Sequence, residues 1–190
     1  MSEQENTHIQ MEFWDNEIVR FEKFPFYGAD KKGNIYSFKK PNKIKKLKLS
    51  TCVDGEYKKV GLRVEKNKVR WLRVNRLMGH AFLGLDIDNI DLDVDHINND
   101  KKNNELSNLR LATRSQNLGA RSKLRNNTSG FKGVRYAYKT KKNKKKWRAE
   151  ISCNNVYYNL GHFSTKEEAA RAYDKKAKEL FGEFANINFN

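Results

Sequence analysis

The sequence predicts an α+β fold built from several small units, because the spacing of its apolar residues changes twice along the chain. Its 190 residues, 37% of them hydrophobic, suffice for one medium domain or two small ones. Residues 11–72 show alternating strands and turns, and residues 73–120 show a helix, two strands and a second helix. Residues 129–190 show three short strands followed by one helix, so we expect a basic linker at residues 121–128.

The N-terminal segment predicts a small β-rich module. The turn-forming run DKKGN precedes the alternating IYSFKK, and GEYKKVGLRV and KVRWLRV are typical of paired strands. The module is followed by an amphipathic helix, which we expect to pack beneath the segment after it. Its apolar residues fall at i, i+3, i+4, i+7 and i+8: Val74, Leu77, Met78, Ala81 and Phe82. We interpret His80, on this helix, as a surface or packing residue rather than a ligand.

The middle of the chain predicts a β, β, α order. LDVDHI is a plausible strand, NNDKKNN a turn and NLRLAT a second strand. Thr113 stands three residues before Gln116, which is the spacing of a capping box. A short helix is therefore predicted to begin at RSQN, with Asn117 in its first turn.

The C-terminal segment predicts three strands, GFKGVRYAYK, KKWRAEISCN and NVYYNLGHF, and then a helix from about Thr165 to Phe181. Ser164 and Glu167 have capping-box spacing, and Gly182 is placed to end the helix. Its buried face is rich in alanine, which lets a helix lie close to a sheet. The run KKNKKK is interpreted as a solvated turn between two strands or, functionally, as a phosphate clamp.

The charge favours a polyanionic partner. The net charge is +16, of which +11 falls in residues 118–190 and +5 in residues 1–117. Nucleic acid is the first candidate, although charge alone does not separate DNA from RNA. Six aspartates nevertheless crowd into one short stretch: Asp86, Asp88, Asp91, Asp93, Asp95 and Asp100. Most are expected in solvated turns, and one or two are candidates to ligate a hard cation.

The targeting and cysteine patterns exclude other classes. The chain has no run of about 18 apolar residues, and its polar start lacks a signal-peptide pattern. We therefore expect a soluble, intracellular protein, in the cytoplasm or in a host cell if viral, without membrane contact. The two cysteines, Cys52 and Cys153, support neither a disulfide framework nor a cysteine zinc site. A catalytic metal would need oxygen or imidazole ligands.

Four residues carry the candidate chemistry: Asp95, His96, Asn108 and Asn117. A ββα hairpin of this spacing can gather all four on one patch. Phosphodiester cleavage needs a base to activate water and a cation to neutralise the charge that builds on the phosphate. Imidazole supplies such a base near neutral pH, and Asp and Asn oxygens suit Mg²⁺. The alternative interpretation is that these are ordinary turn and cap residues.

The segment VDHINNDKKNNELSNLRLATRSQN resembles the HNH (ββα-metal) nucleases, particularly the homing endonucleases. The resemblance implies that His96 is the general base and that Asn108 orients it. It also implies that Asp95 and Asn117 hold one Mg²⁺ or Mn²⁺ and that there is no structural metal. Arg110 is a candidate for contacting phosphate or holding the loop. RLMGHAFLG resembles the helix that precedes this motif, and EFWDNEIVR with GNIYSFKK resembles a NUMOD4-like N-terminal module.

Residues 129–190 resemble an AP2/ERF DNA-binding domain. The resemblance implies a three-stranded antiparallel sheet packed on one helix, with the sheet in the DNA major groove. It also implies a core containing Phe163 and Tyr173. The predicted DNA contacts are Lys132, Arg135, Trp147, Arg148 and Tyr158. Asn159 replaces the tryptophan usual before the LG pair, so Tyr157 or Tyr158 is expected to take over its contact, and the preferred DNA sequence does not carry over.

These features predict a site-directed endonuclease acting on double-stranded DNA, with no obligatory protein partner. His96 would deprotonate the attacking water, and the products would carry 5′-phosphate and 3′-hydroxyl ends. One active site per chain implies nicking unless the chain dimerises or rebinds. The main alternative is a non-catalytic DNA-binding transcriptional regulator. An RNA-binding protein is a third possibility, and the absence of RNP-type aromatic motifs argues against it.

Overall fold

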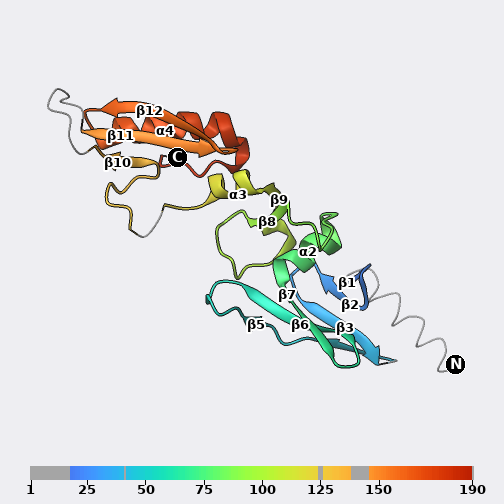
Figure 1. The fold of residues 1–190 in the computed structure, drawn as a ribbon. Helices are drawn as coiled ribbons and strands as arrows, with labels where there is room; N and C mark the ends of the chain where they lie inside the picture. Colours follow the sequence, from blue (N-terminus) through green and yellow to red (C-terminus); the bar gives the residue numbers. More distant parts are fainter. Residues whose placement is uncertain (1–17, 41, 124–125, 138–145, 190) are drawn as a thin grey trace. The chain divides into compact units, whose positions relative to one another are not determined.

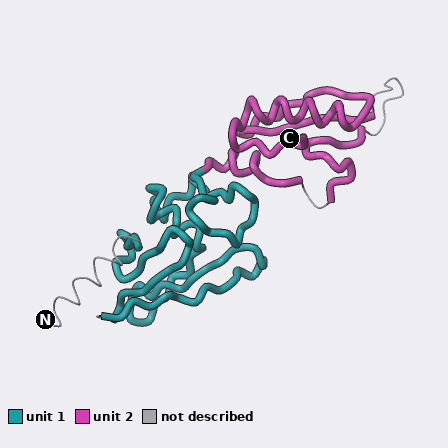
Figure 2. The backbone as a smooth tube through the Cα atoms, turned by 180° about the vertical axis from the view of Figure 1, so that it is seen from behind, with its two compact units in different colours: residues 1–111 teal, residues 112–190 magenta. Residues whose placement is uncertain are grey.

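A computed structural model describes residues 18–40, 42–123, 126–137 and 146–189. The chain divides into two compact units, residues 1–111 and 112–190 (Figure 2). The boundary falls within the segment predicted as the nuclease unit. Most of the KKNKKK run lies outside the described residues. No helix in the described part of the chain has both the length and the apolar content needed to span a bilayer.

Unit 1 contains two small antiparallel sheets (Figure 1). The first has the order β1-β2-β3-β4, with β1 at Ile18–Phe21, β2 at Phe24–Asp30, β3 at Ile35–Lys40 and β4 at Lys43–Lys46. The second has the order β5-β6-β7, with β5 at Ser50–Thr51, β6 at Lys58–Glu65 and β7 at Lys68–Arg73. The strands predicted at IYSFKK, GEYKKVGLRV and KVRWLRV are therefore confirmed as β3, β6 and β7.

The turn between β2 and β3 is fixed by its own side chains. The Asp30 carboxylate accepts hydrogen bonds from the backbone N–H groups of Lys32 and Asn34, each at 2.9 Å. Gly33 has a φ of 79°, which a residue with a Cβ adopts only with strain. The sequence DKKGN therefore specifies this turn locally.

The rest of unit 1 is one helix and most of a hairpin. The elements are α2 at Val74–Phe82, β8 at Leu92–His96, the 3₁₀ turn η1 at Leu106–Asn108 and β9 at Leu109–Thr113. β8 and β9 pair as a two-stranded sheet. One hydrophobic core joins all these parts: it includes Phe21 and Ile35 from the first sheet, Leu77 from α2, and Val94 and Leu109 from the hairpin. The β-rich module and the hairpin thus share a single core.

Unit 2 begins in β9, continues through α3 at Arg114–Ala120, and contains a three-stranded antiparallel sheet with one long helix. The strands are β10 at Val134–Tyr136, β11 at Trp147–Cys153 and β12 at Val156–Phe163, followed by α4 at Lys166–Phe181 and η2 at Gly182–Phe184. α4 covers one face of the sheet (Figure 1). Ala149 on β11 and Ala169 on α4 are fully buried, so their small side chains permit this close approach.

The helix ends agree with the sequence except at one position. The capping box of Thr113 and Gln116 on α3 is confirmed, and Gly182, with a φ of 53°, follows the last residue of α4. The prediction of a capping box at Ser164 was wrong, because Thr165 caps α4 and Glu168 returns the hydrogen bond.

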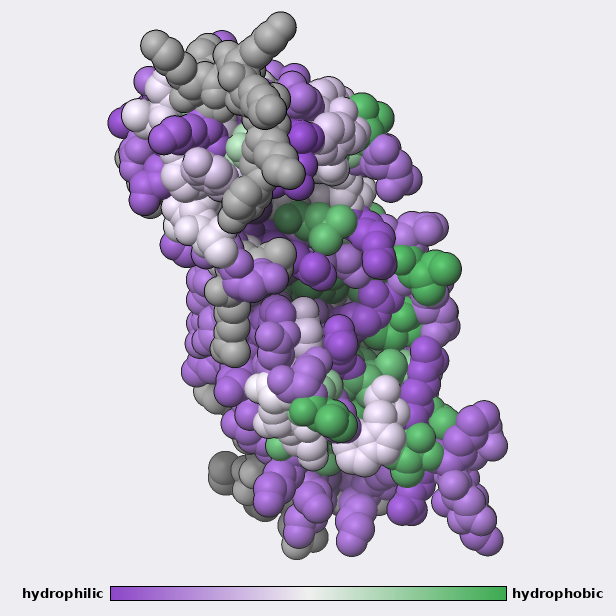
Figure 3. Space-filling model, turned by 60° about the vertical axis from the view of Figure 1, so that its left-hand side comes forward, coloured by the Kyte–Doolittle hydropathy of each residue, from purple (hydrophilic) through white to green (hydrophobic). Residues whose placement is uncertain are grey.

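The surface is strongly hydrophilic, in keeping with a mean hydropathy of −0.92. Figure 3 shows a face on which small hydrophobic patches are separated by hydrophilic residues.

Candidate active site

The helix α2 fixes the position of β8, the strand that carries the first two candidate residues. The buried side chain of Asn75 donates its Nδ2 hydrogen to the carbonyl oxygen of Val94 at 3.0 Å. The Arg76 guanidinium donates to the carbonyl oxygen of Leu92 at 3.1 Å. Gly79 faces Val94 so closely that a Cβ at Gly79 would lie 2.7 Å from Val94 Cγ2. The expectation that this helix packs beneath the following segment is confirmed.

His80, also on α2, takes a packing role. Its Nδ1 lies 2.8 Å from the carbonyl oxygen of Leu85, and its ring centroid lies 6.3 Å from that of Phe21. The interpretation of His80 as a packing histidine agrees with these contacts.

Asp95 and His96 end β8, and both are buried, with 6% and 5% of their surfaces exposed. His96 Nε2 lies 3.3 Å from Oδ1 of Asn104. Since an amide oxygen only accepts hydrogen bonds, Nε2 carries the proton and Nδ1 keeps its lone pair. Burial lowers the pKa of His96 below its ordinary 6.5, while the hydrogen bond to Asn104 and the charge of Asp95 oppose this shift. The result is a neutral imidazole at neutral pH, which is the form that can accept a proton.

Asn104 is held in place from two sides. Its Nδ2 donates to the carbonyl oxygen of Lys102 at 3.1 Å, and the residue is 7% exposed. The β2–β3 turn braces the same loop: the backbone N–H of Leu106 donates to the carbonyl oxygen of Lys31 at 2.8 Å. A Cβ at Gly33 would lie 2.6 Å from the backbone oxygen of Asn104, so only glycine permits this approach.

Asn108 shapes the loop between β8 and β9. Its Oδ1 accepts from the backbone N–H of Asn98 at 3.0 Å, and its Nδ2 donates to the carbonyl oxygen of Asn103 at 2.9 Å. The loop-shaping half of the expected role therefore agrees with the contacts. The side chain within hydrogen-bond distance of His96 is Asn104, which lies in the run NNDKKNN that was predicted only as a turn.

Asp95 forms an ion pair with Arg110. The Arg110 Nε donates to Asp95 Oδ2 at 3.0 Å, and the two side chains are 18% and 7% exposed. Arg110, predicted to contact DNA or hold the loop, is thus engaged with the candidate metal ligand. Asn117 lies on α3 in the other compact unit, so its joint role with Asp95 stays a prediction.

The donor set at this site consists of oxygen and nitrogen atoms. No group of three or more His, Cys, Asp or Glu side chains within the described residues is arranged to hold a metal ion. A carboxylate assisted by amide oxygens and water suits Mg²⁺ or Mn²⁺, which need few protein ligands. The chemistry of Asp95 and Asn117 fits such an ion.

In unit 2, the face of the sheet opposite α4 gathers two of the predicted contact residues. Arg135 on β10 pairs in register with Arg148 on β11, which pairs with His162 on β12. Glu150 joins the two arginines, with oxygen-to-nitrogen distances of 2.9 Å to Arg135 and 3.0 Å to Arg148. The Tyr157 hydroxyl also donates to Glu150, at 2.8 Å, and contacts Arg148. Arg135 and Arg148, with Glu150 bound to both, lie side by side on this face, and we call them the arginine row.

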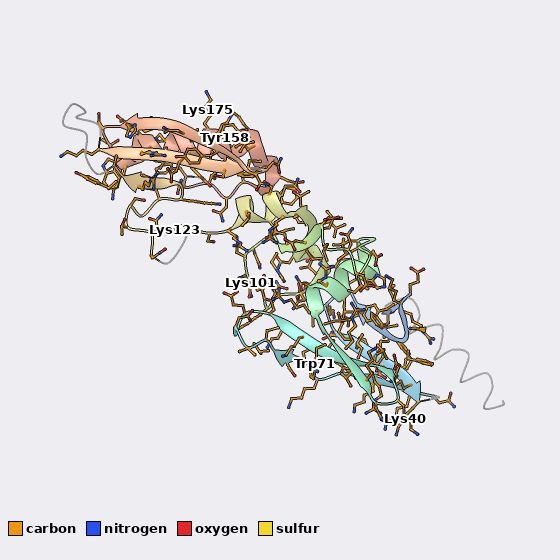
Figure 4. All side chains as sticks on the ribbon, in the orientation of Figure 1. Lys40, Trp71, Lys101, Lys123, Tyr158 and Lys175 are labelled. Carbon is orange, nitrogen blue, oxygen red and sulfur yellow. The ribbon has the colours of Figure 1, made fainter. Side chains whose placement is uncertain are left out.

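Three other predicted contact residues have different surroundings. Trp147 packs against the core between sheet and helix, with Tyr136 edge-on at 5.4 Å. Tyr158, labelled in Figure 4, packs against the core on the α4 side. The Lys132 ammonium donates to the carbonyl oxygen of Gly119, and burial lowers the pKa of Lys132 to about 8. These surroundings favour packing roles for all three, and Tyr157 rather than Tyr158 stands beside the arginine row.

Known proteins resemble both halves of this arrangement. A sequence profile described as HNH endonuclease matches residues 73–118, which contain α2, the hairpin and most of α3. An uncharacterized HNH endonuclease of Acanthamoeba polyphaga mimivirus is 41% identical over 98 residues, covering 52% of this chain and 48% of the relative. Protein 3.8 of Escherichia phage T7 is 32% identical over 94 residues, covering 50% of this chain and 74% of that protein. The chain belongs to the HNH endonuclease family.

Two further similarities concern parts of this HNH endonuclease. A solved structure titled "DNA binding and cleavage by the HNH homing endonuclease I-HmuI" has a TM-score of 0.46 and 31% identity, covering 54% of this chain and 55% of that one. An ethylene-responsive transcription factor of Arabidopsis thaliana is 44% identical over 69 residues, covering 35% of this chain and 25% of that protein. The chain spans about half the length of the mimivirus relative.

In this HNH endonuclease the structure brings together Asp95, His96, Asn108 and Arg110 around the end of β8. Sequence reasoning missed the contact of Asn104 with His96. One available signal was its spacing: Asn104 follows His96 by eight residues, in a loop that must return to pair β9 with β8.

Proposed function

We propose that this HNH endonuclease hydrolyses phosphodiester bonds of double-stranded DNA, with His96 as the general base. The observation that carries the proposal is the setting of His96: a buried imidazole at the end of β8 whose Nε2 lies 3.3 Å from Asn104 Oδ1 and whose neighbour in the chain is Asp95. The family match over residues 73–118 supports the reaction class.

In the proposed reaction, His96 Nδ1 takes a proton from a water molecule, and the water oxygen attacks phosphorus. The bond from phosphorus to the 3′ oxygen breaks, which leaves a 5′-phosphate and a 3′-hydroxyl after protonation of the leaving oxygen. Asp95 and Asn117 would hold one Mg²⁺ or Mn²⁺, which supplies positive charge beside the phosphate and the leaving oxygen. Asn104 keeps the proton on Nε2, and Arg110 holds the Asp95 carboxylate in place.

The test is plasmid cleavage. Purified protein is incubated with supercoiled plasmid and Mg²⁺, with and without EDTA, beside His96→Ala and the control His80→Gln. Metal-dependent nicking that is lost in His96→Ala and kept in His80→Gln is expected. DNA binding without cleavage under any divalent metal would overturn the enzyme assignment and leave a DNA-binding regulator, the alternative favoured by the transcription-factor relative.

We also propose that the arginine row of unit 2 directs the enzyme to its DNA site. Arg135 and Arg148 stand on the sheet face opposite α4, and arginine is the side chain best suited to bind a guanine edge through two hydrogen bonds. Both arginines pair with Glu150 within the chain, and acceptor groups of DNA can take the place of this carboxylate. The similarity to the plant transcription factor supports this assignment.

Arg148→Gln tests the targeting role. The expected result is a loss of preferred cleavage sites and a 5- to 150-fold weaker binding to them, roughly the worth of one base-reading arginine. Arg171→Gln, on α4 behind the sheet, removes the same charge and is the matched control. If the two substitutions changed site preference and DNA affinity equally, the arginine row would contribute only general electrostatic attraction to DNA.

A further inference from the structure

A loop of the N-terminal module reaches the active-site histidine. Residues 52–57, between β5 and β6, form a closed turn in which the backbone N–H of Cys52 donates to the carbonyl oxygen of Tyr57 at 2.8 Å. The Asp54 carboxylate accepts from the backbone N–H of Glu56 at 3.0 Å, and Gly55 has a φ of 73°. This turn delivers the Tyr57 ring to within 6.0 Å of the His96 ring, measured between centroids.

Two cations lie against the same tyrosine. The Arg73 guanidinium, from the end of β7, is 4.1 Å from the centroid of the Tyr57 ring, and the Lys101 ammonium, from the β8–β9 loop, is 5.2 Å from it. Contacts of cations with an aromatic face hold each long side chain in a defined position. Three separate segments of unit 1 therefore converge beside His96, and two of them bring positive charge.

The present partners of these cations are weak. Arg73 lies 3.9 Å from Asp54, and Lys101 forms an ion pair with Glu56. The four side chains are between 38% and 53% exposed, and ion pairs this exposed contribute little to stability. The pKa of Asp54 is lowered mainly by the hydrogen bond that its carboxylate accepts from the backbone N–H of Glu56. This carboxylate therefore serves mainly to close the turn. A phosphate can therefore replace both carboxylates at little cost.

The cationic surface continues across β6 and β7. Lys59 pairs in register with Arg73, and its ammonium lies 5.3 Å from the centroid of the Trp71 ring. Trp71 is 59% exposed although it is large and aromatic. Figure 4 labels Trp71 and Lys101, both in unit 1. Alternating cations and aromatic rings are a combination that suits a nucleic-acid backbone.

We propose that Arg73 and Lys101, positioned on Tyr57, bind the DNA backbone phosphate next to His96. The pair would hold the strand so that phosphorus faces the water activated by the imidazole, and the β-rich module would thereby complete the active site. This inference rests on the proposed function, since it assigns the substrate-binding group of that same site.

The test compares two double variants of the full chain with equal charge changes. Arg73→Gln with Lys101→Gln removes the proposed phosphate-binding pair. Lys66→Gln with Lys68→Gln removes two lysines at the opposite end of the β6–β7 hairpin and is the control. Plasmid nicking gives kcat and KM, and DNA binding is measured at several salt concentrations in the His96→Ala background. A thermal melt checks that each variant is folded, and Arg73→Lys tests whether a conservative change retains function.

The expected result for the first variant is a fall in kcat/KM on the order of 10- to 100-fold, with a salt-dependence slope smaller by about 1.8. The control should stay near wild type, and Arg73→Lys should retain part of the rate. If wild type nicks DNA and both double variants nick equally well, the inference is wrong while the nuclease stands. If wild type does not nick at all, the proposed function fails, and equal salt slopes for the two variants would then refute the phosphate-binding role independently.

Discussion

Replacing Gly79 by alanine is expected to slow cleavage at least 10-fold in a protein that still folds. The new Cβ would lie 2.7 Å from Val94 Cγ2, which is 0.7 Å short of the 3.4 Å where ordinary contact begins, and 3.2 Å from Leu85 Cδ2. Overpacking of this kind costs about 1–3 kcal/mol, and alanine returns roughly 1 kcal/mol of helix propensity. The net loss of stability is therefore about 0–2 kcal/mol.

The rate is more sensitive because Val94 directly precedes Asp95 on β8. A shift of several tenths of an ångström in β8 moves both candidate residues, and misplacement by about 1 Å can cost on the order of 100-fold in rate. We expect at least a 10-fold slower single-turnover nicking at a temperature where the thermal melt shows both proteins folded.

A second substitution makes this reasoning refutable. Val94→Ala removes the methyl group that the new Cβ meets, so the Gly79→Ala, Val94→Ala double variant should cleave faster than Gly79→Ala alone. If Val94→Ala brings no recovery, or if Gly79→Ala nicks DNA at the wild-type rate, then α2 does not set the position of β8 in the way described.

Three further expectations follow from the contacts. Asn104→Ala removes the acceptor of the His96 Nε2 proton and should lower kcat about 10-fold or more with little change in DNA affinity; an unchanged kcat would contradict the positioning role. Because burial lowers the pKa of His96, the base stays neutral until the pH falls below 6.5, so the acid limb of the nicking rate should have its midpoint below 6.5; a pH profile with a higher midpoint would argue against this base. Gly133→Ala places a Cβ 1.9 Å from the Tyr173 ring at a φ of 72°, and it should destabilise unit 2 by roughly 2–5 kcal/mol. The control is Gly130→Ala, which has no atom within 4 Å of the new Cβ and introduces backbone strain alone. Equal shifts in the melting temperature of the two variants would show that the ring contact is unimportant.

The fold was predictable from sequence wherever local patterns determine it. Alternation located β3 and β6, and helical periodicity located α2, because each pattern reports which face of one element is buried. The start of α4 shows the limit of this approach. Ser164 and Thr165 are both followed by glutamate after three residues, so spacing alone fits two caps, and the structure has the cap at Thr165.

The candidate site was less predictable where it depends on distant segments. Asp95 and His96 are adjacent in sequence and share a strand, so a short motif identifies them. Asn104 lies beside His96 in a loop that is hydrogen-bonded to the distant β2–β3 turn. Tyr57 lies in a loop 39 positions before His96 in the sequence, and no periodic pattern of residues predicts that the two rings are close. These contacts are tertiary, and local sequence patterns do not contain them.

A β-bulge in β12 explains one of the two discrepancies in unit 2, that of Tyr158. Trp147 and Tyr158 were expected to contact DNA, yet both pack on the helix side of the sheet. A register shift between Ala149 and Glu150, opposite Gly161, changes the alternation partway along the sheet. A bulge of this kind is set by pairing between strands, so a single strand read alone does not disclose which face each later side chain takes.

The close contact of Gly33 with the backbone of Asn104 has an evolutionary consequence. A targeting module attached by a linker can be exchanged between enzymes by recombination without harming catalysis. The β-rich module of this protein does not meet that condition, because its turn contacts the backbone of Asn104 and its strands share a core with the hairpin. We expect lineages of this enzyme to inherit residues 18–111 as one piece and to exchange the sheet of unit 2 more freely.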